Sequence, residues 1–203
     1  MSSKIVVATG NRGKLAEFSQ LLGERFELLS QKDLKVDEAE ETGLSFVENA
    51  LLKARNAAAQ TGLPALADDS GLCVNALNGA PGIYSARYAG DGASDTDNNA
   101  KLVEKLAGEN NRRAHFHCAL VFVRHATDPA PIICEGRWPG EIIDTARGGN
   151  GFGYDPVFGM PDGRTLAEYR SEEKHAISHR GVAARKVVPF LDRLLADTPD
   201  LFR

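Results

Sequence analysis

The stretch that most constrains the fold lies near the N-terminus, where an apolar run passes through a glycine-containing loop into a helix. Ile5 to Ala8 is rich in β-branched side chains, which is typical of a strand buried on both faces. After a polar loop, apolar residues return at helical spacing: Leu15, Phe18, Leu21 and Leu22. This order indicates the first βα unit of an α/β fold.

The rest of the chain mixes further βα units with antiparallel strands. Ser45 followed by Glu48 is a capping box that predicts a helix, and Gly62 is placed to end it. Strands are expected at 26–30, 63–71, 113–126 and 131–143, and helices near 95–107, 165–173 and 181–195. We predict an α/β fold with a mixed, twisted sheet and flanking helices. We expect 1–203 to form one elongated, two-lobed domain with a central cleft.

Composition limits the partners that this chain can bind. The formal net charge is −4, which gives no electrostatic basis for binding nucleic acid or an anionic membrane surface. No apolar run approaches the length of a membrane span, and the N-terminal one is too short for a signal peptide. We therefore expect a cytoplasmic protein with no nucleic-acid or membrane partner. The cysteines form no C-x-x-C pair, so neither a zinc site nor a disulfide framework is predicted.

The loop after the first strand is a candidate phosphate cradle. A strand-to-helix junction offers backbone N–H groups and the positive end of the helix dipole to an anion, and a lysine adds a full charge. The spacing is shorter than that of a Walker A loop, and no Ser or Thr follows the lysine. The alternative is an ordinary βα turn. The residues concerned are Thr9, Gly10, Asn11, Arg12, Gly13 and Lys14.

Two pairs of acidic residues are candidate metal ligands. Asp68 and Asp69 close a predicted strand, and neighbouring side chains of a strand point to opposite faces, so only one can face a given site. Carboxylates suit Mg²⁺ together with substrate phosphates and retained waters. Glu40 and Glu41, before the capped helix, could supply a further carboxylate. The alternatives are a solvated turn and an exposed acidic loop.

Two later stretches could bind a nucleoside. In "GFGYDP" (151–156), glycines allow backbone to approach a ligand, and Phe152 or Tyr154 could stack on a planar base; a structural bend is the alternative. The stretch "EEKHAISHRG" (172–181) places three side chains near a helix start as a site for an anion or a base edge: Lys174, His179 and Arg180.

Together these motifs resemble one family. "TGNRGK", "EETG", "ADDSGL", "GAPGIYSARYAG", "GFGYDP" and "EEKHAISHRG" occur in the order found in the inosine triphosphate pyrophosphatase family. The resemblance runs from about Ile5 to the C-terminal helix. It implies an Mg²⁺-dependent homodimer that hydrolyses ITP, dITP and XTP to the nucleoside monophosphate and pyrophosphate. Such activity keeps deaminated purines out of DNA and RNA.

The resemblance also implies roles for individual residues. Thr9 to Lys14 would hold the triphosphate, with Lys53 as a further candidate. Asp69 would accept the proton of the attacking water and bind magnesium, with Glu40 or Glu41 as the other metal carboxylate. Ser70 would contact substrate. The nucleoside and its base would be held by Phe152, Gly153, Tyr154, Asp155, Lys174, His179 and Arg180.

Three other readings make different predictions. A phosphatase that removes the terminal phosphate would release orthophosphate. A nucleotide sensor would bind without turnover, although carboxylates beside a triphosphate count against a pure binder. A generic α/β domain would use the same glycines and acids structurally.

Overall fold

The computed structural model describes residues 3–202, apart from the side chains of Arg12, His175, Ala176 and Pro199. It contains a six-stranded mixed sheet with strand order β2-β1-β3-β4-β5-β6. β1 pairs in parallel with β2 and β3, whereas β5 pairs antiparallel with β6. The strands are β1 (Lys4–Val7), β2 (Glu27–Ser30), β3 (Ala65–Val74), β4 (Arg113–Val123), β5 (Ile132–Ile142) and β6 (Phe158–Gly159). The predicted α/β class with a mixed sheet and flanking helices is confirmed.

The helix predicted from the capping signals at Ser45 and Gly62 is present as α2. The helices are α1 (Arg12–Leu22), α2 (Phe46–Thr61), α3 (Asp95–Lys105), α4 (Ser171–Ile177) and α5 (His179–Asp197). Ser45 caps α2 by accepting from the Glu48 N–H, and Gly62 ends it with a positive φ of 68°. Short 3₁₀ segments cover Asn75–Leu77, Gly82–Arg87, Asp155–Val157, Leu166–Glu168 and Pro199–Phe202. In the described chain, no helix has the length and apolar content needed to cross a membrane.

Two predicted boundaries were wrong. The expected helix at 165–173 is a 3₁₀ turn followed by α4. Glu168 accepts from the Thr165 N–H and Glu173 from the Arg170 N–H, so two helical segments start in succession. The expected strand end at 68–71 was also wrong. β3 continues to Val74 because Leu72 and Val74 maintain the two-residue alternation and are fully buried. Asp68 and Asp69 therefore lie in the middle of a strand.

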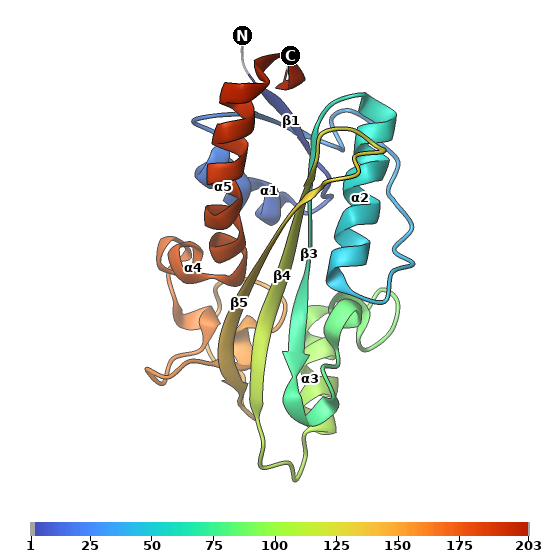
Figure 1. Cartoon of the computed structure of the whole chain (residues 1–203). Helices are drawn as coiled ribbons and strands as arrows, with labels where there is room; N and C mark the ends of the chain where they lie inside the picture. The colour runs from blue at the N-terminus through green and yellow to red at the C-terminus, as the bar shows by residue number, and fades with distance from the viewer. Residues whose placement is uncertain (1–2, 203) are drawn as a thin grey trace. The chain divides into compact units, whose positions relative to one another are not determined.

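The chain divides into two compact units. Unit 1 comprises the residues up to Asp69, then 118–136, then those from Arg180 onward, and unit 2 comprises 70–117 and 137–179. In unit 1, α1 and α5 cover one face of the sheet and α2 covers the other (Figure 1). Ile5, Val7 and Leu66 pack toward α1 and α5, whereas Val6, Ala65 and Ala67 pack toward α2.

Unit 2 has its own apolar core. Leu72 and Val74 of β3 pack with Leu102 of α3 and Phe116 of β4. The remaining buried members of this core are Leu106, Ala114, Trp138, Ile142, Tyr154, Val157, Phe158, Leu166 and Tyr169. This core fixes the segment that leads into α4.

Candidate active site

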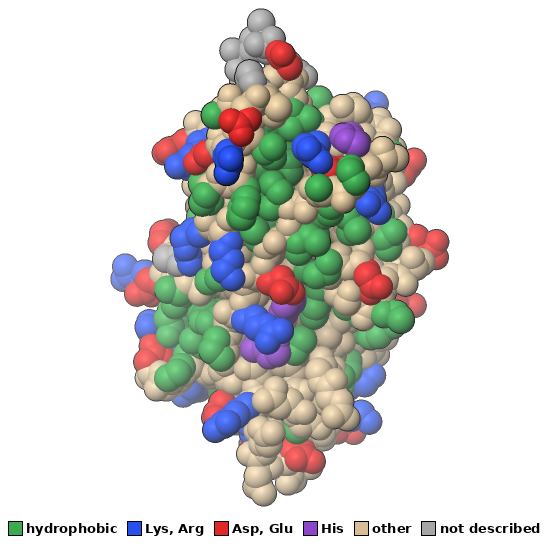
Figure 2. All heavy atoms as spheres, in the orientation of Figure 1, with side chains coloured by type: hydrophobic (Ala, Val, Ile, Leu, Met, Phe, Trp, Pro, Cys, Tyr) green, Lys and Arg blue, Asp and Glu red, His purple; other side chains and the backbone are tan. Residues whose placement is uncertain are grey.

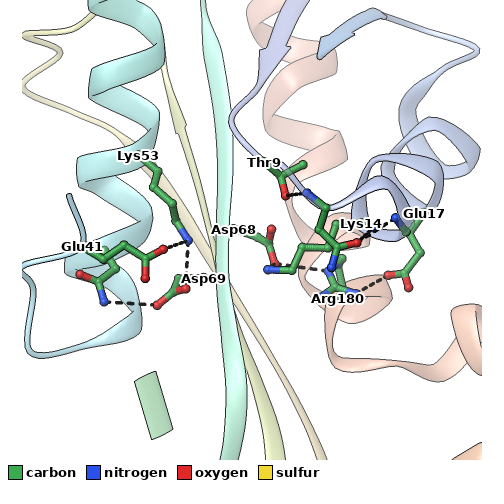
Figure 3. Close-up of polar contacts among 11 residues, drawn as sticks. Thr9, Lys14, Glu17, Glu41, Lys53, Asp68, Asp69 and Arg180 are labelled. Atoms are coloured by element: carbon green, nitrogen blue, oxygen red, sulfur yellow. Dashed lines mark hydrogen bonds and ion pairs between the residues drawn. The ribbon is translucent and has the colours of Figure 1, made fainter. Parts of the chain in front are cut away.

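The alternation of side chains along β3 separates the two adjacent aspartates. Leu66 faces α1 and α5, so Asp68, two residues later, faces the same way. Ala67 faces α2, so Asp69 does too. Figure 3 shows the ribbon of β3 passing between two groups of side chains, one around each aspartate. The prediction that only one of the pair can face a given site is confirmed.

On the side of α1 and α5 lies the Asp68 cluster, which we define as Lys14, Glu17, Asp68 and Arg180. Asp68 Oδ2 lies 2.9 Å from Lys14 Nζ and accepts from Arg180 Nε at 3.3 Å. Arg180 also donates through Nη1 to Glu17 at 2.5 Å. Burial alone would raise the pKa of Asp68, but the charges of Lys14 and Arg180 outweigh it and hold that pKa well below its usual range.

Glu17 was missed at the level of the sequence. It lies on α1, three residues after Lys14, and only 5% of it is exposed. A carboxylate at a buried helical position needs a partner. That requirement could have marked Glu17 as a candidate site residue. The sequence does not show that its partner is Arg180, which is 163 residues away.

The loop from Thr9 to Lys14 differs from the expected cradle in one respect. Asn11 caps α1, and its Oδ1 accepts from the N–H groups of Gly13 and Lys14 at 2.8 and 3.1 Å. The Asn11 N–H in turn donates to Thr9 Oγ1 at 3.2 Å. The sequence predicted that backbone N–H groups here are offered to an anion, but those of Gly13 and Lys14 are satisfied within the loop, because Asn is a strong N-cap. The side chain of Arg12 lies outside what the structure describes.

On the side of α2 lies the Asp69 cluster, which comprises Glu41, Asn49, Lys53 and Asp69. Lys53 Nζ lies 2.9 Å from Asp69 Oδ1 and 3.0 Å from Glu41 Oε1. Asn49 donates to Asp69 Oδ2 at 3.5 Å. Burial raises the pKa of the Asp69 carboxyl by more than the Lys53 charge lowers it. A buried carboxylate with a raised pKa is a better proton acceptor than an exposed one.

The Asp69 cluster has a donor set that fits a divalent cation. Asp69 and Glu41 converge on one positively charged group, the Lys53 ammonium. Mg²⁺ is commonly held by one or two carboxylates together with phosphates and waters, so two carboxylates suffice. Among the described residues, no group of three or more His, Cys, Asp and Glu could hold a metal by itself. Glu40, the alternative to Glu41, is exposed.

In unit 2, the glycine loop (Gly151–Asp155) carries the candidate nucleoside contacts. Asp155 Oδ2 accepts from the Phe152 N–H at 3.0 Å and pairs with Lys174. Lys174 Nζ lies 4.9 Å from the centre of the Phe152 ring, which is 45% exposed. Tyr154 is buried, and its hydroxyl donates to the Ser85 carbonyl at 2.8 Å. Phe152, rather than Tyr154, therefore offers a ring surface for stacking.

The remaining predicted residues of unit 2 have distinct surroundings. His179 is buried, with its ring 5.0 Å from that of Phe116 and nearly parallel to it, and 6.5 Å from Trp138. Ser70, the next residue of β3 after Asp69, is half-buried. The sequence predicted that Arg180 lies with Lys174 and His179 in a site for an anion or a base edge, and the structure places its guanidinium in the Asp68 cluster, bonded to Asp68 and Glu17.

The fold and these clusters define an α/β protein in which a central strand carries lysine–carboxylate pairs on both faces. The chain belongs to the Ham1 family, whose sequence model matches residues 5–190. A Shigella flexneri protein called dITP/XTP pyrophosphatase is 56% identical over 93% of this chain and 98% of its own length. A protein of the same name from Escherichia coli K12 is 54% identical over the same shares. The resemblance stated from the motifs is thereby confirmed.

Solved structures agree. A HAM1 protein from Coxiella burnetii superposes with a TM-score of 0.89 at 50% identity, covering 94% of this chain and 98% of its own. A Mycobacterium abscessus protein titled nucleoside-triphosphatase and dITP/XTP pyrophosphatase superposes with a TM-score of 0.74 at 45% identity, covering 93% of this chain and 99% of its own. These identities are high enough for the likeness to concern the family and not the fold alone.

Proposed function

We propose that this protein hydrolyses deaminated purine nucleoside triphosphates, namely ITP, dITP and XTP, to the nucleoside monophosphate and pyrophosphate. This activity would keep such nucleotides from being incorporated into DNA or RNA. The observation that carries the proposal is the Asp69 cluster, a buried carboxylate beside a lysine and a second carboxylate, in a chain of the Ham1 family. The names of relatives at 54–56% identity support the substrate class.

Asp69 is the proposed proton acceptor. It would take a proton from the water that attacks the α-phosphorus, and its raised pKa supports that role. Lys53 would bind the neighbouring phosphate, and Glu41 would bind the cation. Bound Mg²⁺ would neutralise charge on the triphosphate and help to orient it.

The other candidate residues would bind the rest of the substrate. Lys14 and the loop from Thr9 would hold the departing pyrophosphate, which develops negative charge as the bond breaks. Phe152 would stack on the base, with Lys174 beside it. Arg180 would read the 6-keto oxygen that distinguishes hypoxanthine and xanthine from adenine.

Several wider properties belong to the same proposal. They are magnesium dependence and a homodimeric state, which the family resemblance implies, together with a cytoplasmic location and the action of residues 1–203 as one catalytic domain. Figure 2 shows Lys and Arg side chains interspersed with Asp and Glu on the viewed face, without a basic stripe. This distribution and the net charge of −4 support a small-molecule substrate rather than nucleic acid.

The decisive experiment is incubation with ITP and Mg²⁺, followed by separation of pyrophosphate from orthophosphate. We expect IMP and pyrophosphate in equal amounts, loss of activity with a chelator and its return with added Mg²⁺. IDP with orthophosphate would indicate a phosphatase. Tight nucleotide binding without product would indicate a sensor.

A further inference from the structure

One residue of the glycine loop, Gly153, is held through both its N–H and its carbonyl oxygen by a single helix. The Gly153 N–H donates to Asp95 Oδ2 at 2.6 Å, and Asn99 Nδ2 donates to the Gly153 carbonyl oxygen at 3.0 Å. Asp95 and Asn99 are four residues apart on α3, so both side chains leave the same face of the helix. The contacts join segments more than fifty residues apart in the sequence.

The residues of this arrangement suit it. Gly153 has a φ of +65°, a conformation that L side chains rarely adopt. Asn99 Oδ1 is buried, and among the described residues it has no hydrogen-bond partner. An unsatisfied amide oxygen is costly, which favours a role for Asn99 as an N–H donor to the loop.

A residue of the glycine loop itself, Asp155, provides a second set of contacts that hold the loop. Asp155 Oδ2 binds the Phe152 N–H and pairs with Lys174. A Cβ on Gly151 would lie 1.9 Å from that Asp155 oxygen, so only glycine leaves room for it. Asp155 therefore holds the N–H of Phe152 and the α3 pair holds Gly153, so two consecutive residues of the loop are anchored.

We infer that Asp95 and Asn99 are positioning residues for the nucleoside: they clamp Gly153 so that the exposed Phe152 ring and the nearby Lys174 ammonium keep one orientation toward the base. This inference rests on the proposed function, which assigns the glycine loop to nucleoside binding. It adds two residues of α3 that touch no substrate and act through the loop. Holding the loop in its bound form before substrate arrives strengthens binding by reducing the ordering cost.

The test combines a structural readout with kinetics. In Asp95→Ala, we expect the Gly153 amide to exchange with deuterium about fivefold to tenfold faster, the effect of losing one hydrogen bond. KM for ITP should rise by about the same factor in Asp95→Ala and in Asn99→Ala, with kcat within about twofold. Asp95→Asn, which keeps an acceptor oxygen, should restore both values.

Asp97→Ala is the matched control. Asp97 forms the capping box of α3 with Ser94 and lies two residues from Asp95, so its loss weakens the same helix without a bond to Gly153. We expect it to lower the melting temperature and leave KM for ITP unchanged. In the double variant Asp95→Ala, Asn99→Ala, KM should rise less than the product of the single effects, because both side chains hold the same residue, Gly153.

The outcomes separate the clamp from the function. An unchanged Gly153 exchange rate in Asp95→Ala would overturn the clamp, whatever the kinetics show. Faster exchange with unchanged KM would overturn its positioning role. If Asp97→Ala raised KM as much as Asp95→Ala, general weakening of α3 would replace the clamp as the explanation. Absence of ITP hydrolysis in the wild-type protein would contradict the proposed function, while the exchange measurement would still decide the clamp geometry.

Discussion

Asp68 and Asp69 are neighbours in sequence with opposite electrostatic surroundings. Asp68 is fully buried between Lys14 and Arg180, so its pKa is depressed and it remains an ion. Asp69 shares its nearest cation, Lys53, with Glu41, and burial raises its pKa. One carboxylate is thus suited to a permanent structural charge and the other to proton transfer.

The first prediction compares Asp69→Asn with Asp68→Asn, which make the same chemical change one residue apart. Asp69→Asn should lower ITP turnover by roughly 10²-fold or more, the effect of losing a general base, with little change in melting temperature. Asp68→Asn should lower the free energy of unfolding by about 3–5 kcal/mol, because it removes a buried counter-charge from Lys14 and from Arg180, which keeps its pair with Glu17.

Steady-state kinetics and thermal unfolding of both variants check this prediction. Near-normal activity of a folded Asp69→Asn protein would transfer the catalytic role to Asp68 or to the Glu40–Glu41 pair. An Asp68→Asn protein as stable as the wild type would mean that the Asp68 cluster contributes little to stability.

The second prediction concerns base selection by Arg180. Its Nε and Nη1 are already bonded to Asp68 and Glu17, so Arg180→Ala would remove a cationic partner from two buried carboxylates. Arg180→Lys keeps the charge and loses the planar fork, which makes it the cleaner variant. We expect wild-type kcat/KM for ITP to exceed that for ATP by at least ~10²-fold, and the lysine variant to reduce that ratio about tenfold.

Measuring kcat/KM for ITP, GTP and ATP with the wild-type and Arg180→Lys proteins tests whether Arg180 selects the base. Equal losses on all three substrates would show that Arg180 serves the Asp68 cluster alone, and that other residues read the base.

At the scale of elements, the packing of α2 depends on small side chains. The buried positions of this helix include Ala50, Ala54, Ala57 and Ala58, and Ala65 and Ala67 of β3 belong to the same apolar cluster. Alanine at these positions lets the helix lie close to the strand. That closeness brings Lys53 of α2 within 2.9 Å of Asp69.

The third prediction follows from this close packing. Ala57→Leu adds three carbon atoms at a fully buried position and should cost about 1–3 kcal/mol by overpacking. Ala59→Leu, on the exposed side of the same helix, should stay within about 0.5 kcal/mol of the wild type. Urea unfolding of the two variants checks it, and equal stabilities would contradict tight packing under α2.

Sequence patterns predicted which helices and strands are present better than they predicted where those elements end or which residues they contact. Ser45, Glu48 and Gly62 marked α2 correctly because caps are local signals. The end of β3 was misplaced because Ser70 and Gly71 suggested a turn, and the burial of Leu72 and Val74 against α3 overrode that local preference.

The candidate site divides in the same way. Lys14, Lys53 and Asp69 could be named from motifs and a resemblance, whereas Glu17 could not, because its reason for being buried is a residue on the last long helix. The sequence analysis assigned Asn11 to a ligand site and not to a helix cap. It therefore did not predict that the N–H groups of Gly13 and Lys14 are bonded to Asn11.

On the scale of the whole molecule, the internal pairing of Lys14 with Asp68 and of Lys53 with Asp69 and Glu41 has an energetic consequence. A triphosphate that binds these lysines would replace the carboxylates as their anionic partner. Each contact would therefore contribute to the binding free energy only the difference between the two ion-pair energies. Such a site holds its ligand less tightly than bare cations would, which suits an enzyme that must release anionic products at every turnover. Because the chain supplies its own counter-ions, Lys14 and Lys53 are already neutralised in the folded chain before a nucleotide binds.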